Sequence, residues 1–157
     1  MTLRDASFPA DLDLVRTLFR EYAEELGVDL CFQGFDEELA SLPGKYAPPQ
    51  GAILLAGEVG CVALRERGDG VCEMKRLFVR PAGRGTGLGR QLAKAILERG
   101  ENLGYREMVL DTLDHLKPAI KLYRELGFDD RAAYYENPLP GVVYMGVSLP
   151  RSTIHAS

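Results

Sequence analysis

Apolar residues recur at helical spacing in three stretches of the chain. In residues 11–26 one helical face carries Leu12, Val15, Leu18, Phe19, Tyr22 and Leu26. Residues 88–97 and 118–126 repeat this spacing, and Tyr123 lies on the apolar face of the latter. A shorter helix is predicted from Asp36, as its N-cap, through Leu42. We therefore expect two helices in the first third of the chain and two in the last half.

Runs of apolar and β-branched residues predict the strands. They cover residues 2–5, 52–56, 59–65, 71–79, 106–112 and 141–149, with an extended segment from residue 128. The order β-α-α-β-β-β-α-β-α-β-β puts antiparallel hairpins first and a strand–helix–strand–helix unit later. This order predicts an α+β fold, with helices packed on one mixed sheet. No linker divides the chain, so we expect a single domain over residues 1–150 and a C-terminal tail over residues 151–157.

The composition is that of a globular protein outside the membrane. Of 157 residues, 46% are hydrophobic and 27% are charged, and no apolar run approaches the roughly 18 residues of a membrane span. Arg4 and Asp5 interrupt the N-terminus, which disfavours a secretory signal. Three widely spaced cysteines, Cys31, Cys61 and Cys72, are most simply reduced thiols. We therefore expect a cytoplasmic location and no membrane partner.

The net charge of −4 conceals two oppositely charged regions. Residues 1–42 hold ten Asp or Glu against three Arg, whereas residues 75–106 hold eight Lys or Arg against two Glu. This asymmetry suits an anionic cofactor and a cationic substrate, although solvated helix faces explain the acidic part equally well. An acidic protein lacks the basic footprint of a nucleic-acid binder, so no nucleic-acid partner is expected.

A glycine-rich segment between a predicted strand and a predicted helix is the strongest candidate for chemistry. It consists of Arg84, Gly85, Thr86, Gly87, Leu88, Gly89 and Arg90. Its bare backbone N–H groups and the helix start after them predict a cradle for a pyrophosphate. The Lys-Ser or Lys-Thr of a Walker loop is missing, and the glycine spacing is not that of a Rossmann turn.

Two strings resemble the GNAT family of N-acetyltransferases. One is Arg84-x-x-Gly87-x-Gly89 preceded by Val79-x-Pro81, and the other runs from Ala119 to Phe128 as Ala-Ile-Lys-Leu-Tyr-Arg-Glu-Leu-Gly-Phe. The resemblance covers residues 52–149. Within the family, the chain resembles a small, uncharacterised bacterial subgroup. It implies the acyl-CoA N-acyltransferase (GNAT) fold, acetyl-CoA as cosubstrate and direct transfer of the acetyl group to an amine.

The same resemblance implies where acetyl-CoA lies. The backbone of Leu77, Phe78 and Val79 would pair with the pantetheine arm at a splay between two strands. Residues 84–89 would hold the pyrophosphate, with the side chains of Arg84 and Arg90 nearby. A backbone N–H near Phe78 or Val79 would stabilise the oxyanion. This chain departs from the family at Leu116, where an Asn is frequent, so any contact of that Asn must come from elsewhere, for example from Thr112.

Two residues are candidates for the proton transfers. Tyr123 occupies the position that the family places beside the CoA sulfur, which makes it the expected general acid; the alternative is a core position on its helix. Glu73 is the expected general base, because a carboxylate in an apolar strand is costly to bury without a reason. A surface pair of Glu73 with Lys75 is an equal alternative, and Tyr134, Tyr135 or a chain of waters could take the role instead.

The acceptor pocket is expected to come from the first helices and the last hairpin. The candidates are Phe32, Gln33, Phe35, Tyr135 and Asn137, with ordinary loop packing as the alternative. Two isolated histidines, His115 and His155, indicate no metal site. The expected function is acetyl transfer to an amine of a small molecule, peptide or protein. The rival is a non-catalytic acyl-CoA-binding sensor or interaction module, and the resemblance allows a homodimer.

Overall fold

A computed structural model describes residues 2–151 of the chain; most of the predicted tail, including His155, lies outside the described residues. These residues form four helices and seven strands in the expected order. They are β1 (Leu3–Asp5), α1 (Leu12–Leu26), α2 (Phe35–Ser41), β2 (Ala52–Ala56), β3 (Gly60–Gly68), β4 (Val71–Val79), α3 (Leu88–Asn102), β5 (Glu107–Leu113), α4 (Lys117–Glu125), β6 (Asp129–Asp130) and β7 (Val142–Ser148). Short 3-10 turns cover Cys31–Gln33, Gly44–Tyr46 and Pro81–Gly83.

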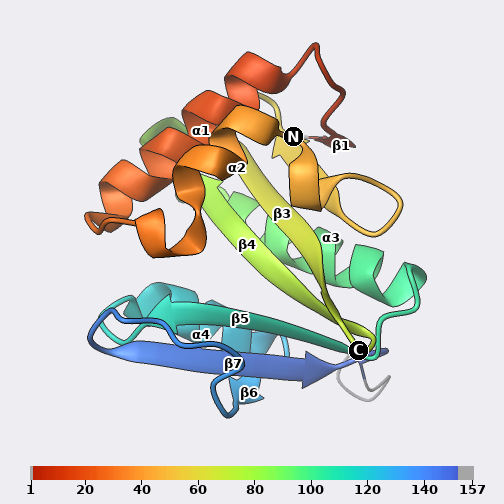
Figure 1. The fold of residues 1–157 in the computed structure, drawn as a ribbon, viewed down its shortest axis with the longest axis vertical. Helices are drawn as coiled ribbons and strands as arrows, with labels where there is room; N and C mark the ends of the chain where they lie inside the picture. Colours follow the sequence, from red (N-terminus) through yellow and green to blue (C-terminus); the bar gives the residue numbers. More distant parts are fainter. Residues whose placement is uncertain (1, 152–157) are drawn as a thin grey trace.

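The strands form one mixed sheet, as Figure 1 shows. Their order is β1-β2-β3-β4-β5-β7-β6, and only the central pair β4–β5 is parallel. All other neighbours are antiparallel. The predicted α+β fold is therefore confirmed.

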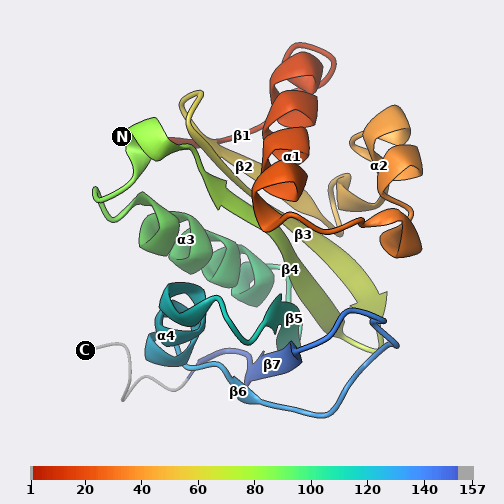
Figure 2. The same ribbon diagram turned by 90° about the vertical axis from the view of Figure 1, so that its left-hand side faces the viewer.

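Helices cover both faces of the sheet, so the protein has two apolar cores (Figure 2). On one face α1 and α2 cover β2, β3 and β4, with Val15, Leu18 and Phe19 of α1 fully buried. On the other face lie α3 and α4, and their core includes Leu92 and Ile96. The apolar faces predicted for α1 and α3 are the faces that pack, because each one meets a strand surface of the same character.

The sheet opens at its centre. The parallel strands β4 and β5 pair only from Val71 to Glu73, opposite Glu107 to Val109, and then diverge. The unpaired ends of both strands therefore face a gap with no sheet partner across it. This gap is the splay that the family resemblance implied.

A bulge in β4 lies at the edge of the splay. Cys61 of β3 pairs with Phe78, and Ala63 pairs with Lys75, so two steps along β3 match three steps along β4. Arg76 takes up the extra residue with a φ of 60°, which is rare for any residue but glycine. The bulge interrupts the regular alternation of side chains along the strand.

Two local predictions differ from the structure. Asp36 is not the N-cap of α2: Gly34 occupies that position in a left-handed conformation, and Asp36 lies in the first turn. The preceding 3-10 turn ends at Gly34 and turns the chain directly into the helix. Glu73 and Lys75 do not form a surface pair, because Glu73 is fully buried and Lys75 is 8% exposed. No helix in residues 2–151 is long and apolar enough to cross a membrane.

Candidate active site

The glycine loop, residues 84–90, leads into an uncapped helix start. Gly85 and Gly87 have φ values of 78° and 79°, which a residue with a side chain rarely adopts. Gly87 is the N-cap of α3 and supplies no side-chain hydrogen bond, and the first turn contains no acidic residue. The first N–H groups of α3 therefore have no side-chain acceptor and are available to an anion.

Gly89 has a different reason to be glycine. Its φ is not positive, and a Cβ built on it would meet no atom within 4 Å. Neither backbone conformation nor packing inside the protein excludes a side chain here. An outside group that approaches the backbone closely would exclude one, which fits a pyrophosphate.

Two exposed arginines flank the loop. Arg84 pairs with Glu25 of α1, and Arg90 pairs with Glu125 of α4; all four side chains are about half exposed. Arg84 also donates to the carbonyl of Val79 at 3.0 Å. Exposed ion pairs are weak, so an incoming phosphate can replace either glutamate at little cost.

The splay opens into a cavity of about 120 Å³. Its walls come from β4, β5, α4, the end of α1 and the loop after β6. Residues predicted for the site that line it are Gln33, Leu77, Tyr123 and Asn137, and the family departure Leu116 and the alternative Thr112 line it too. Phe78 and Val79 do not line it; Phe78 is buried in the core beneath α1.

Tyr123 reaches the cavity from α4. The residue is 8% exposed, and its ring packs edge-on against Phe128 at 5.8 Å. Burial raises the pKa of its hydroxyl above the ordinary value, so the hydroxyl keeps its proton at neutral pH. Tyr123 is thus both a core residue and a lining residue, so its place in the core does not exclude the general-acid role predicted for it.

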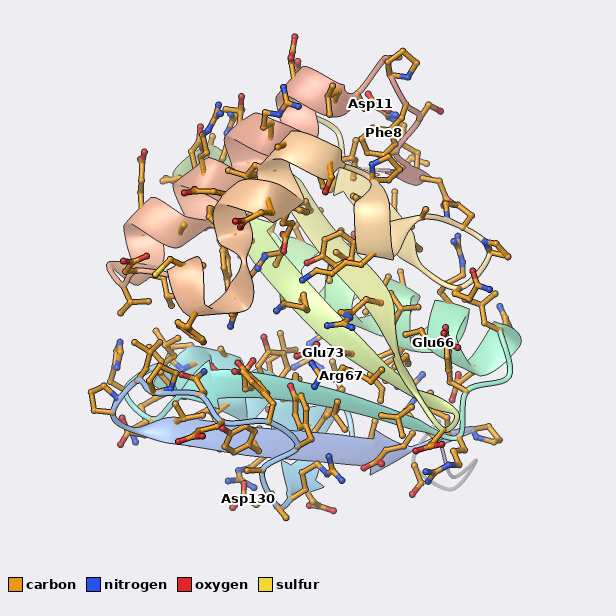
Figure 3. The ribbon with its side chains drawn as sticks, in the orientation of Figure 1. Phe8, Asp11, Glu66, Arg67, Glu73 and Asp130 are labelled. Atoms are coloured by element: carbon orange, nitrogen blue, oxygen red, sulfur yellow. The ribbon has the colours of Figure 1, made fainter. Side chains whose placement is uncertain are left out.

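Glu73 lies outside the cavity lining. Its side chain is fully buried and accepts a hydrogen bond from Tyr134 at 2.6 Å. The Tyr134 bond ends on Oε2, whereas Arg67 lies 3.4 Å and Arg65 3.9 Å from the other oxygen, Oε1. Figure 3 shows Glu73 and Arg67 side by side where β3 and β4 approach β5. The carboxylate is therefore held by a tyrosine and two arginines rather than directed into the splay.

Two of the predicted acceptor residues bond to Asp111 of β5, and a third, Gln33, bonds to one of them. The hydroxyl of Tyr135 donates to Asp111 Oδ2, and Asn137 Nδ2 donates to the same oxygen at 2.8 Å. Gln33 Nε2 donates to the Tyr135 hydroxyl at 3.1 Å, across 102 positions of the sequence. Asp111 lines the cavity. Gln33, Tyr135 and Asn137 thus position a carboxylate.

Two cations from the β4 bulge complete this cluster. Lys75 Nζ and Arg76 Nη1 both donate to Gln33 Oε1, at 3.0 and 2.9 Å. Arg76 also forms two hydrogen bonds of 2.9 Å with the buried carboxylate of Glu38 in α2. We call Gln33, Lys75, Arg76, Asp111, Tyr135 and Asn137 the polar cluster.

Phe32 and Phe35 do not line the cavity. Phe35, the first residue of α2, is buried in the core, and the partly buried Phe32 packs against the same core. The Phe35 ring lies 5.1 Å from the Arg76 guanidinium. Phe35 therefore supports the polar cluster through Arg76.

Lys75, Arg76 and Asp111 were missed as site residues. Charges at two consecutive positions of an apolar strand were a signal for the first two. Asp111 gave none, because an acidic residue in an alternating strand usually faces solvent.

The sheet parts between two parallel strands, and an uncapped helix start lies beside the opening. Comparisons with known proteins identify the class of protein that has this fold. The model of the acetyltransferase (GNAT) family matches residues 14–128. An uncharacterized N-acetyltransferase of Schizosaccharomyces pombe is 46% identical over 96% of both chains.

Solved structures agree on the fold. An acetyltransferase of Streptococcus agalactiae superposes with a TM-score of 0.76 at 21% identity, over 94% of this chain and 98% of that one. The protein yncA of Salmonella typhimurium, solved with its cofactor acetyl-CoA, superposes with a TM-score of 0.66 at 22% identity. This match covers 97% of this chain and 95% of that one. The chain belongs to the GNAT acetyltransferase family and is an N-acetyltransferase.

Proposed function

We propose that the protein transfers an acetyl group directly from acetyl-CoA to a primary amine of a small molecule or peptide. The observation that carries this proposal is the cavity at the splay, which brings Tyr123 and Asp111 to one space. Tyr123 is suited to donate a proton to a leaving group, and Asp111 is suited to hold an amine. A cytoplasmic location and a homodimer stay predictions.

The donor side fits acetyl-CoA. The uncapped start of α3 and the open space at Gly89 suit the pyrophosphate, and the unpaired end of β4 at Leu77 suits an extended arm with amide groups. Bound there, acetyl-CoA supplies the activated acetyl group as a thioester. Backbone N–H groups near Phe78 and Val79 would then stabilise the oxyanion.

Tyr123 is proposed as the general acid. Tyr123 lines the cavity and carries its proton at neutral pH, which suits a group that gives its proton to a departing thiolate. Replacing Tyr123 by Phe should lower kcat at least tenfold and leave CoA affinity unchanged, since the hydroxyl acts only on the leaving sulfur. Tyr105→Phe is the matched control, because Tyr105 is equally buried but bonds to Gln50 away from the cavity.

The test is release of free thiol from acetyl-CoA in the presence of a panel of amines, with CoA affinity measured separately. Amine-dependent thiol release that Tyr123→Phe reduces supports the proposal. Tight CoA binding with no thiol from any amine, and no effect of Tyr123→Phe, would overturn it in favour of a non-catalytic acyl-CoA-binding module.

A carboxylate is proposed to take the proton from the amine. Glu73 is the base predicted from the sequence, whereas Asp111 is the carboxylate that lines the cavity. We expect Asp111→Asn to lower kcat/KM at least a hundredfold, and Glu73→Gln to lower it less. The pH profile of each variant identifies the base, because loss of the base removes the acid limb. A larger loss in Glu73→Gln would give the role to Glu73, with Tyr134 as the relay.

A further inference from the structure

Lys75 is a buried cation without an anion. The residue is 8% exposed, and its Nζ atom donates a hydrogen bond to the neutral amide oxygen of Gln33. Among residues 2–151 no carboxylate oxygen lies within 4.0 Å of Nζ. The guanidinium of Arg76 shares the same amide oxygen, so a second positive charge lies close by.

The two cations differ in how their charge is balanced. Arg76 donates two hydrogen bonds to the carboxylate of Glu38, which neutralises its charge inside the protein. Lys75 has no such partner within contact distance. Burial, together with Arg76 and Lys45, lowers its pKa to about 8, and the more distant charges of Glu73 and Asp111 offset this shift only in part. A buried charge without a counterion is costly, so an anion that entered the cavity beside Lys75 would be bound strongly.

The bulge explains why both cations line the cavity. Consecutive residues of a regular strand point to opposite faces, but Arg76, with its positive φ, interrupts the alternation of β4. Lys75 and Arg76 therefore both line the splay. A strained backbone that turns a second charge toward a cavity is a feature that folding alone does not require.

The opposite wall is negative. Asp111 Oδ2 accepts hydrogen bonds from both Tyr135 and Asn137, while no side chain in the described range donates to Oδ1. This second oxygen is available to an ammonium group. One cavity thus carries an unbalanced cation on β4 and an available carboxylate oxygen on β5.

We propose that the acceptor is a small amine that carries a carboxylate, such as a free amino acid, with Lys75 as the residue that selects for the carboxylate. Lys75 Nζ binds the carboxylate of the acceptor, and Asp111 binds its amino group. A polyamine brings a second positive charge toward Lys75 and Arg76 and is disfavoured. This inference rests on the proposed acetyl transfer and specifies its substrate class.

The transfer balances with this acceptor. The amine nitrogen forms a bond to the acetyl carbon, and the bond from that carbon to sulfur breaks. Of the two protons that the ammonium group loses, one ends on the CoA thiol and the other is released to water. The carboxylate of the acceptor takes no part in these bonds and serves recognition.

The test compares each amino acid of a panel with the amine that lacks only its carboxylate, for example alanine with ethylamine and phenylalanine with phenethylamine. Rates of thiol release are compared at equal concentration of unprotonated amine. We expect at least one amino acid to exceed its amine partner tenfold or more in kcat/KM. In Lys75→Met this preference should fall to about one, whereas Lys75→Arg should retain it because the charge remains.

Lys45→Met is the control, since Lys45 is a half-buried lysine that pairs with Glu38 and does not line this cavity. CoA affinity and thermal melting of each variant show that the fold is intact. Amines that react as well as their amino acids, or a preference that persists in Lys75→Met, would overturn the substrate class and leave acetyl transfer standing. No thiol release with either series would instead count against the proposed function itself.

Discussion

The glycine loop and the polar cluster both contain arginines paired with glutamates, but the pairs differ in solvent exposure. In the glycine loop Arg84 and Arg90 are about half exposed, and their glutamate partners are exposed as well. In the polar cluster Arg76 is almost completely buried, and so is Glu38. Exposed pairs exchange partners readily, whereas a buried pair fixes geometry. The loop is thus suited to accept a mobile anion, and the cluster is suited to shape a small cavity.

The largest difference between the two regions should appear in stability. Glu38→Gln leaves the buried guanidinium of Arg76 without its counterion and should lower the free energy of unfolding by about 3–5 kcal/mol. Glu25→Gln makes the same change opposite the exposed Arg84 and should cost less than about 1 kcal/mol. Urea denaturation measures both. Equal losses would mean that the two pairs do not differ as their burial indicates.

The glycine loop was predictable because it is contiguous in sequence. Its glycines, the helix start and the neighbouring strand all fall within a short stretch, and the string that ends at Phe128 supported the same interpretation. Positive φ values depend on the residue type at each position, so glycines in a short stretch report them directly.

The polar cluster was only partly predictable. Gln33, Tyr135 and Asn137 were expected in the pocket, but the residue that the last two bond to, Asp111, comes from a contact across the sheet. The bulge at Arg76 depends on how β4 pairs with β3, and a period of two in the sequence does not reveal it. Phe35 was expected in the pocket, but it packs against Arg76 in the core rather than lining the cavity.

A smaller effect, of opposite sign, is expected at Lys75. Removing a buried cation that has no counterion should raise stability, so Lys75→Met should increase the free energy of unfolding at pH 7 by about 1–3 kcal/mol. Its pKa of about 8 in the folded protein lies below the ordinary lysine value of 10.5. The unfolded chain therefore binds more protons between these values, and the stability contribution of this group rises as pH increases from about 8 to 10.5.

Chemical denaturation of the wild type and Lys75→Met at pH 7 and pH 10 measures this effect. The advantage of Lys75→Met should shrink at pH 10, where the wild-type lysine is neutral in the folded state. Lys45→Met supplies the comparison, since Lys45 has a carboxylate partner and its removal should not stabilise the protein. A destabilised Lys75→Met at pH 7 would show that Lys75 is balanced within the protein, and the cavity would then have no need of an anion.

The smallest effect on stability is expected at Gly89, where a substitution should change CoA binding and little else. Gly85 and Gly87 are unsuited to this test, because their positive φ values would strain any side chain. At Gly89 the backbone and the surrounding space both accept one. Gly89→Glu places a carboxylate in the first turn of α3, where the helix dipole favours it, so the free energy of unfolding should stay within about 0.5 kcal/mol of the wild type or rise.

The same carboxylate would stand where the pyrophosphate is proposed to bind. Repulsion and loss of space should weaken CoA binding at least tenfold, which corresponds to about 1.4 kcal/mol. Gly89→Ala is the control: its methyl group takes far less space than a glutamate side chain and adds no charge, so it should weaken CoA binding less than Gly89→Glu does. Calorimetric titration with CoA decides between them. If Gly89→Glu binds CoA as the wild type does, the N-terminus of α3 is not the pyrophosphate site, and the exposed arginines of the glycine loop lose the role assigned to them here.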